Sequence, residues 1–159
     1  MQMEIERKFL LKETPEGFES ARKYAIRQGY LVSTDFREIR VRMKGTDCFL
    51  TIKDGRGLER AETEISISQA QFDQLWPLTE GQRIQKTRYL LPWKELTIEV
   101  DVYDAPLAPL RVAEVEFESR EACEKFVKPG FLGQEVTGQK EYSNVYLATA
   151  HQNRKETAD

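Results

Sequence analysis

The chain has 159 residues, of which 32% are charged, and its formal net charge is −3. This length suits a single domain that is large enough to bury a hydrophobic core. No apolar run approaches the roughly 20 residues that span a bilayer, and charges begin at residue 4, so the sequence predicts neither a membrane span nor a secretory signal. An acidic chain also lacks the overall basic field that nucleic-acid binding normally needs. We therefore expect a cytoplasmic protein with neither membrane nor nucleic-acid partners.

The few cysteines and histidines exclude several kinds of site. Cys48 and Cys123 show no metal-ligand spacing, and two free thiols are the simpler interpretation, although a disulfide between them stays open. His151 is the only histidine and lies in a polar tail. A Ser-His-Asp triad or a histidine zinc site is therefore not expected.

In chain order, short segments that alternate apolar and charged residues predict a protein rich in strands. The predicted strands cover residues 3–11, 36–44, 47–53, 60–67, 84–91, 95–103 and 110–118, with an eighth between these or near 30–33. Gly45 and Thr46, between the second and third of them, are typical of a hairpin turn.

The first predicted helix lies between the first two strands. Thr14 is an N-cap candidate, and Pro15 suits the first helical position. The helix is expected to run to about Gln28 and to stop at Gly29.

Three further helices are predicted later in the chain. Ser68 opens a capping-box pattern before the second helix, and Ser119 would cap the third. The last helix is expected over residues 139–150. The final residues, 151–159, are expected to fray.

The first strand places two acids and a base in one row. In an extended strand, residues i, i+2 and i+4 point to one face, so Glu4, Glu6 and Lys8 share a face. Carboxylates one strand repeat apart, roughly 6.5–7 Å, suit a hard divalent cation such as Mg²⁺ or Mn²⁺. A cationic side chain in the same row suggests that the other ligand of the metal is an anion. This pattern indicates a phosphate-processing site.

A solvated strand shows the same alternation, so one row by itself favours an ordinary exposed face. The pattern recurs, however, in six further segments. Their rows are Arg40, Arg42 and Lys44; Thr51 and Lys53; Arg60, Glu62 and Glu64; Lys86 and Arg88; Glu99 and Asp101; and Glu114 and Glu116. Most rows carry one sign of charge. The repetition favours a common function over a solvated surface.

The helices and the charged rows together predict the fold class. If helices cover the apolar face of a curved sheet, the charged rows are left on its inner face, and closing the sheet puts them inside a barrel. Buried charges must pair, bind ligands and stay hydrated, and the predicted inner set holds eight acids and seven bases. We expect an α+β fold: an eight-stranded antiparallel β-barrel with a charged interior and helices packed on the outside. From periodicity alone, an antiparallel sheet with one charged face remains the alternative.

These rows resemble the CYTH, or triphosphate tunnel metalloenzyme, superfamily. The opening Glu4-x-Glu6-x-Lys8 is similar to its ExExK signature, which is a weak motif alone. The later matches follow in order: Ile39-Arg40-Val41-Arg42, Leu50-Thr51-Ile52-Lys53, Glu62-x-Glu64, Lys86-x-Arg88, Glu99-Val100-Asp101 and Glu114-Val115-Glu116. Residues 135–144 resemble the closing segment of short bacterial tripolyphosphatase-like members. The resemblance implies one domain over residues 1–150, with an eight-stranded barrel whose tunnel binds triphosphates together with a divalent metal.

The resemblance also implies roles for individual residues. Glu4, Glu6 and Glu116 would be ligands of Mg²⁺ or Mn²⁺, with Glu114 as a further candidate. The groups that hold phosphate oxygens would be Lys8, Arg40, Arg42, Lys53, Lys86 and Arg88. Tyr30 and Lys86 resemble a pair that acts during hydrolysis in some short members, although an aromatic residue at such a position is more often core. Glu62, Glu64, Glu99 and Asp101 would bind a second metal or orient the bases through ion pairs.

The leading functional hypothesis is a metal-dependent triphosphatase that hydrolyses inorganic tripolyphosphate or a related small polyanion. A class IV adenylate cyclase, a thiamine or nucleoside triphosphatase, and a non-catalytic polyphosphate-binding module remain alternatives. The sequence leaves the oligomeric state open, including a homodimer.

Overall fold

The computed structural model of the chain describes residues 2–55 and 59–149. Within these ranges the strands are β1 Gln2–Leu11, β2 Arg22–Ser33, β3 Arg37–Lys44, β4 Asp47–Asp54, β5 Glu59–Ile67, β6 Arg83–Trp93, β7 Leu96–Tyr103, β8 Arg111–Phe117 and β9 Leu132–Glu135. The helices are α1 Gln69–Leu75, α2 Arg120–Lys125 and the short 3₁₀ helices η1 Phe18–Ser20, η2 Trp76–Thr79 and η3 Lys140–Tyr142. Residues 144–149 are also helical. The predicted tail, residues 151–159, lies outside the described residues.

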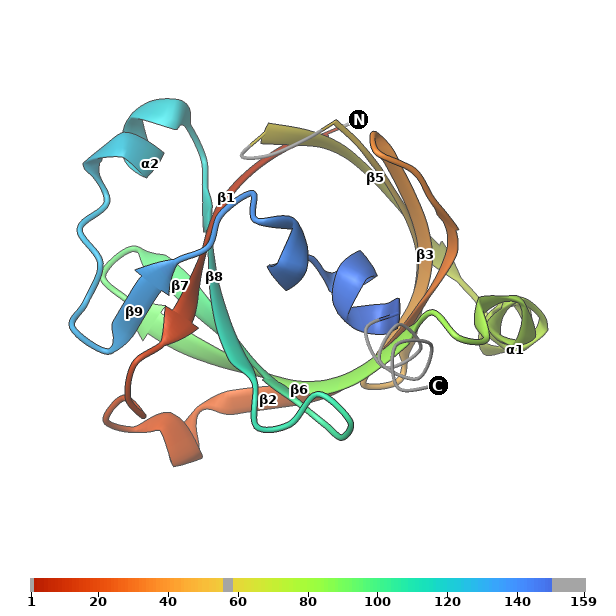
Figure 1. Cartoon of the computed structure of the whole chain (residues 1–159), viewed down its shortest axis with the longest axis horizontal. Coiled ribbons are helices and arrows are strands. Elements are labelled where there is room, and N and C mark those ends of the chain that lie inside the picture. The colour runs from red at the N-terminus through yellow and green to blue at the C-terminus, as the bar shows by residue number, and fades with distance from the viewer. Residues whose placement is uncertain (1, 56–58, 150–159) are drawn as a thin grey trace, which may run out of the picture.

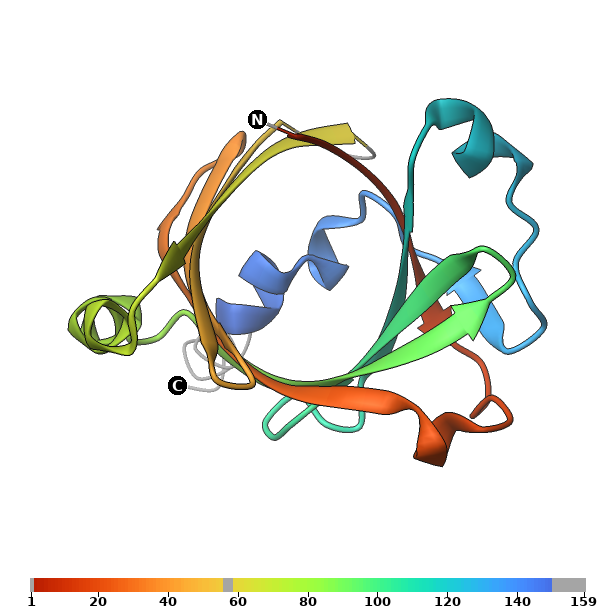
Figure 2. The same ribbon diagram turned by 180° about the vertical axis from the view of Figure 1, so that it is seen from behind.

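In the described part of the chain, eight strands close into an antiparallel barrel, which Figures 1 and 2 show from opposite sides. The hydrogen-bonded order is β5-β4-β3-β2-β6-β7-β8-β1, and a pairing between β1 and β5 completes the ring. Along one edge, β1 pairs with two different strands. Its first residues pair with β5, and its last residues pair with β9. The predicted eight-stranded antiparallel barrel is thereby confirmed.

The strand register puts the charged rows on the inner face of the barrel. Directly opposed residues of antiparallel strands share a face. Arg88 lies opposite Asp101, and Lys8 lies opposite Glu114. The apolar residues that alternate with these rows therefore point outward, where they form one core under α2 and β9 and another under α1. Because these two hydrophobic cores lie outside the ring, the charged rows are left on its inner face.

The prediction of a helix from Pro15 to about Gln28 is wrong, because most of this segment is the strand β2. Only the one-turn helix η1 forms before it, and the N-cap of η1 is Gly17 rather than Thr14. β2 pairs with β6 on one side and with β3 on the other. Two hydrogen-bonded neighbours outweigh a local helix preference, since tertiary context routinely overrides propensity. The inner face of β2 brings Gln28 and Tyr30 into the barrel.

Gly29 does not end a helix but allows a close approach between β2 and η2. A Cβ atom at Gly29 would lie 2.4 Å from Thr79 Oγ1 and 2.5 Å from Thr79 Cβ. We expect Gly29→Ala to lower the free energy of unfolding by about 1–3 kcal/mol, the usual cost of overpacking, in urea denaturation. The matched control is Gly130→Ala, because a Cβ there would meet nothing within 4 Å. Equal stability of the two variants would contradict this packing.

The helices α1 and α2 form where their caps predict them, and both lie outside the ring (Figure 1). The Ser68 side chain accepts a hydrogen bond from the backbone N–H of Gln71, whose side chain in turn accepts from the backbone N–H of Ser68. The Ser119 side chain accepts from the backbone N–H of Ala122. Among the described residues, no helix is long and apolar enough to cross a membrane.

The C-terminal segment differs from the predicted arrangement, because it lies within the ring in both views (Figures 1 and 2). The expected single helix over 139–150 is divided into η3 and the helical residues 144–149. Leu147 and Ala148 belong to one buried cluster with Tyr30. This part of the inner wall is apolar. The C-terminal segment therefore packs against an apolar surface inside the barrel, whereas α1 and α2 pack against the apolar surface outside it.

Candidate active site

The barrel encloses a cavity of about 230 Å³ whose lining is almost entirely polar or charged. The predicted site residues that line it are Glu4, Glu6, Lys8, Tyr30, Arg40, Arg42, Lys53, Glu62, Glu64, Arg88, Glu99, Glu114 and Glu116. The other two, Lys86 and Asp101, have fully buried side chains and do not line the cavity. The fold thus brings nearly all of the predicted residues to one place.

One side of the cavity, the acid wall, consists of Glu4, Glu6, Glu114 and Glu116 from β1 and β8. Burial, with repulsion from Glu114 and Glu4, raises the pKa of Glu6 to about 8. Burial and repulsion from Glu4 likewise raise the pKa of Glu116 to about 6. Ionising Glu6 and Glu116 is therefore costly unless a cation lies near them.

Of the two carboxylate oxygens of Glu4, the described residues provide a hydrogen-bond partner for only one. Its Oε1 atom accepts a hydrogen bond from Lys53 Nζ at 3.0 Å, whereas its Oε2 atom is buried and has no hydrogen-bond partner among them. A buried oxygen without a partner costs free energy. A divalent cation at this point would satisfy Oε2 and relieve the repulsion within the acid wall.

The donor set of the acid wall suits such a cation. Carboxylate oxygens are ligands that Mg²⁺ prefers, and Mg²⁺ is usually held by one or two carboxylates together with water and phosphate oxygens. Among the described residues, no three Asp, Glu, His or Cys side chains form a group that could by itself hold a metal. Glu4, Glu6 and Glu116 would therefore hold a cation only together with ligands from water and an anionic substrate.

Glu114 differs from the other acids of the wall because cations surround it. Its Oε1 atom lies 3.5 Å from Lys8 Nζ, and its Oε2 atom lies 4.0 Å from Arg88 Nη2. Burial alone would raise the pKa of Glu114, but Lys8 and Arg88 hold it well below its usual value. The geometry thus favours Glu114 as an ion-pair partner of these bases.

The other side of the cavity, the base wall, is centred on Arg40 and Arg42 of β3. Figure 1 shows β3 across the ring from β1 and β8. Arg40 is buried and Arg42 is half-buried, and in the described part of the chain no carboxylate forms an ion pair with either. Burial and repulsion from Arg40 and Arg88 lower the pKa of Arg42 to about 9. The base wall therefore keeps positive charge that no carboxylate of the described residues pairs directly.

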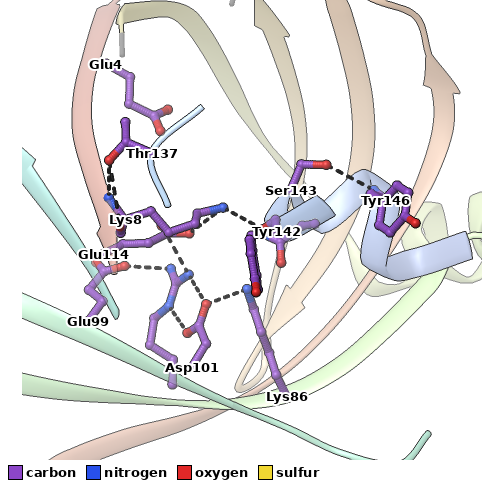
Figure 3. A network of polar contacts seen from close by, with 12 residues as sticks. Glu4, Lys8, Lys86, Glu99, Asp101, Glu114, Thr137, Tyr142, Ser143 and Tyr146 are labelled. Carbon is purple, nitrogen blue, oxygen red and sulfur yellow. Dashed lines mark hydrogen bonds and ion pairs between the residues drawn. The ribbon is translucent and has the colours of Figure 1, made fainter. Parts of the chain in front are cut away.

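Lys86 and Arg88 are held by Asp101 beneath the cavity lining. Lys86 Nζ lies 2.6 Å from one oxygen of Asp101, and Arg88 Nε lies 2.7 Å from the other. Arg88 Nη1 also contacts Glu99 at 2.8 Å. Figure 3 shows Asp101 between Lys86 and the network that includes Glu99. Both oxygens of Asp101 are occupied, which favours the ion-pair role over a second metal. Burial, with repulsion from Arg88, lowers the pKa of Lys86 to about 7 in spite of Asp101.

Tyr30 lies at the cavity with its hydroxyl group held from one side. The side chain is 1% exposed, and Gln28 Nε2 donates to Tyr30 Oη at 3.2 Å. Burial raises the pKa of Tyr30 to about 12, so the hydroxyl group is neutral at physiological pH. Within the described residues, no hydrogen bond joins Tyr30 to Lys86.

Two further acids, Glu62 and Glu64 of β5, also line the cavity. Glu62 lies directly opposite Lys53 of β4, and its charge is among those that raise the pKa of Glu116. Glu64 lies opposite Thr51 and is the more exposed of the two. These positions leave both the second-metal role and the supporting role open to them.

The CYTH domain family model matches residues 2–131 of the chain. The chain belongs to the CYTH family.

Named relatives share this CYTH domain over almost their whole length. An inorganic triphosphatase of Nitrosomonas europaea is 47% identical over 148 residues, which are 91% of this chain and 96% of that protein. An inorganic triphosphatase of Acetivibrio thermocellus is 33% identical over 150 residues, which are 92% of this chain and 94% of that protein. The crystal structure of an inorganic triphosphatase superposes with a TM-score of 0.69 at 43% identity, covering 94% of this chain and 96% of that one.

Several cavity residues of this CYTH chain were not among the sequence candidates. Glu38 shares the inner row of β3 and contacts Arg60 at 3.0 Å, so the alternation of that strand could have identified it. Ser143 and Asn144 come from the segment after the matched region, and the short hydrogen bond from Tyr103 Oη to Asn144 Oδ1 is 2.5 Å. No local pattern predicts that this segment enters the barrel.

Proposed function

We propose that this protein hydrolyses inorganic tripolyphosphate to pyrophosphate and phosphate, in a reaction that depends on Mg²⁺ or Mn²⁺. The observation that carries the proposal is the division of one cavity into an acid wall and a base wall. A polyphosphate chain with a bound cation has this same division of charge, since the cation suits the carboxylates and the free phosphate oxygens suit the arginines. The names of the two curated relatives support the choice of substrate.

In this proposal the bases of the cavity hold the substrate. Arg40 and Arg42 would each grip phosphate oxygens through two N–H groups, whereas Lys8 and Lys53 act as point charges. Lys53 now contacts Glu4, and Lys8 contacts Glu114 and the carbonyl oxygen of Tyr142 at 3.1 Å. These contacts hold the ammonium groups at the cavity before substrate arrives.

The acid wall would hold the metal through Glu4, Glu6 and Glu116. A bound divalent cation neutralises phosphate charge and lowers the pKa of a bound water. In the overall reaction, a water oxygen forms a bond to a terminal phosphorus, the bond from that phosphorus to the bridging oxygen breaks, and pyrophosphate leaves with the electron pair. Phosphoryl transfer needs mainly positioning and charge stabilisation, so the protein need not supply a nucleophile.

Tyr30 is the proposed hydrogen-bond donor to the leaving oxygen, because its hydroxyl group stays protonated at the cavity surface. Lys86 does not reach the cavity, so its proposed role is to hold Asp101, which in turn orients Arg88. This proposal thus gives Lys86 a positioning role in place of the catalytic and phosphate-binding roles that the resemblance implies.

Tyr30→Phe tests the hydroxyl group without removing the ring from the core. We expect kcat for tripolyphosphate hydrolysis to fall about 100-fold, the lower end of what a positioned proton donor contributes. The circular dichroism spectrum should be unchanged. A kcat equal to that of the wild type would return Tyr30 to a packing role.

A phosphate-release screen tests the proposed function. Tripolyphosphate, pyrophosphate, thiamine triphosphate and ATP are each incubated with Mg²⁺ or Mn²⁺. The proposal expects the highest kcat/KM with tripolyphosphate and no turnover in EDTA. Formation of cyclic AMP from ATP would instead identify a cyclase, and tight binding without turnover would identify a binding module.

One observation favours an organic triphosphate as the second candidate substrate. A neighbouring cavity of about 580 Å³ shares Glu6, Lys8 and Ser143 with the first cavity. Its lining includes residues 33–38 and 136–140, so it could take a group attached to one end of the triphosphate. Thiamine triphosphate or ATP hydrolysed faster than tripolyphosphate would support this alternative.

We also propose that the protein acts in the cytoplasm. Cys48 and Cys123 are both free and buried, which agrees with the expectation of two thiols and suits a reducing compartment.

A further inference from the structure

We infer that Gln28 is a positioning residue, which fixes Arg42 and Tyr30 at the cavity while leaving the charge of Arg42 available to the substrate. This inference rests on the proposed function, since it concerns how the same cavity attracts a polyanion. The Gln28 side chain is fully buried and lies on the inner face of β2, directly opposite Arg42 of β3.

Both ends of the Gln28 amide are engaged. Its Oε1 atom accepts a hydrogen bond from Arg42 Nε at 3.0 Å, and its Nε2 atom donates to Tyr30 Oη at 3.2 Å. A guanidinium group has only donors, so the amide oxygen must face the arginine and the amide nitrogen must face the phenol. A single side chain therefore sets the orientation of two groups that face the substrate.

The chemical type of this anchor differs from that of four other cations of the barrel, which are anchored by carboxylates. Lys53 contacts Glu4 at 3.0 Å, Lys8 contacts Glu114 at 3.5 Å, and Asp101 anchors Lys86 and Arg88. Each of these anchors cancels part of the charge that it holds. A neutral amide holds the Arg42 guanidinium as firmly in geometry without cancelling its charge. A glutamate side chain has nearly the same shape as glutamine but carries a negative charge. Gln28→Glu would therefore change mainly the electrostatics of this anchor.

The same contact directs the Tyr30 hydroxyl group. Gln28 Nε2 donates a hydrogen bond to one lone pair of Tyr30 Oη. With this donor on its oxygen, the hydroxyl group can direct its own proton to an acceptor in the cavity that Tyr30 lines. A phosphate oxygen is such an acceptor.

The experiment compares Gln28→Glu and Gln28→Met with the wild type. The dissociation constant of tripolyphosphate is measured by calorimetry in EDTA, where no turnover occurs, and kcat and KM are measured with Mg²⁺. We expect Gln28→Glu to weaken binding about 10- to 100-fold, the loss of one charge-assisted contact, and Gln28→Met to weaken it about 3- to 10-fold. Gln85→Glu is the matched control, because it adds the same charge at an exposed position of β6.

A double-mutant cycle separates positioning from general loss of structure. If Gln28 acts on binding through Arg42, then Gln28→Met should not weaken binding further in an Arg42→Met background. Additive losses in this cycle, or an unchanged dissociation constant in Gln28→Glu, would overturn the inference. If circular dichroism shows that Gln28→Glu does not fold, the binding of Gln28→Met and the double-mutant cycle still test the inference. A wild type that binds tripolyphosphate without hydrolysing it would refute the proposed function while leaving the Gln28 result readable.

Discussion

Glu6→Gln is expected to abolish metal-dependent hydrolysis and, in the same variant, to stabilise the metal-free protein at alkaline pH. The loss of hydrolysis follows from the proposed removal of a metal ligand, and we expect kcat/KM to fall at least about 100-fold. The gain in stability follows from the acid wall, where the half-buried Glu6 lies near Glu4 and Glu114. An amide of the same shape keeps the packing and removes the repulsion.

The sign of the pH dependence follows from the raised pKa of Glu6. Burial and neighbouring acids raise it from 4.5 to about 8, so between these values the folded protein holds a proton that the unfolded chain has released. The stability that Glu6 contributes is therefore complete below pH 4.5 and is lost as the pH rises through about 8. Glu6→Gln does not suffer this loss. We expect it to be more stable than the wild type at pH 9 by about 1 kcal/mol or more, which corresponds to roughly 2–4 °C in Tm.

Thermal unfolding in EDTA at pH 5 and pH 9 measures this difference, together with phosphate release at saturating Mg²⁺. Glu95→Gln, at an exposed turn between β6 and β7, is the control and should match the wild type in both assays. Undiminished hydrolysis by Glu6→Gln would rule out the proposed metal site. A Tm difference that is the same at both pH values would show that the acid wall is not under electrostatic strain.

Asp101→Asn is expected to be the most destabilising of the single substitutions considered. Asp101 is fully buried and accepts hydrogen bonds from both Lys86 and Arg88. Removing one partner of a buried ion pair leaves an uncompensated charge, which typically costs about 3–5 kcal/mol. Urea denaturation should show this loss as a lower midpoint with an unchanged slope.

The pH dependence of this loss identifies its cause. Burial and Arg88 already lower the pKa of Lys86 to about 7, and the loss of Asp101 would lower it further. Lys86 can then release its proton as the pH rises, so the destabilisation should be smaller at pH 9 than at pH 6. Asp54→Asn is the control, because the Arg37–Asp54 pair is largely exposed, and it should not change stability measurably. Equal effects of the two substitutions would contradict the buried network.

The strand segments could be predicted because alternation is a local property. β1, β3, β7 and β8 each show charges at every second position, and their bounds agree with the predicted ranges to within one or two residues. Of β2, only the end near residues 30–33 was predicted as a possible strand, because Thr14, Pro15 and Gly29 are typical of helix ends, whereas the pairing of β2 with β3 and β6 is long-range. The role of Gln28 could not be predicted for the same reason, since a position on an expected helix gives no direction toward the barrel interior.

The sequence by itself determined that acids and bases alternate with apolar residues along successive strands, and this is enough to imply a charged surface facing an apolar one. Only the tertiary structure decided which carboxylate meets which cation. Asp101 and Glu116 occupy similar local patterns, yet Asp101 lies under Arg88 and Lys86, whereas Glu116 lies among other acids. Strand register and barrel closure set these neighbours, and neither is encoded within a single strand. The entry of the C-terminal segment into the ring also depends on an apolar inner surface that exists only after the barrel has closed.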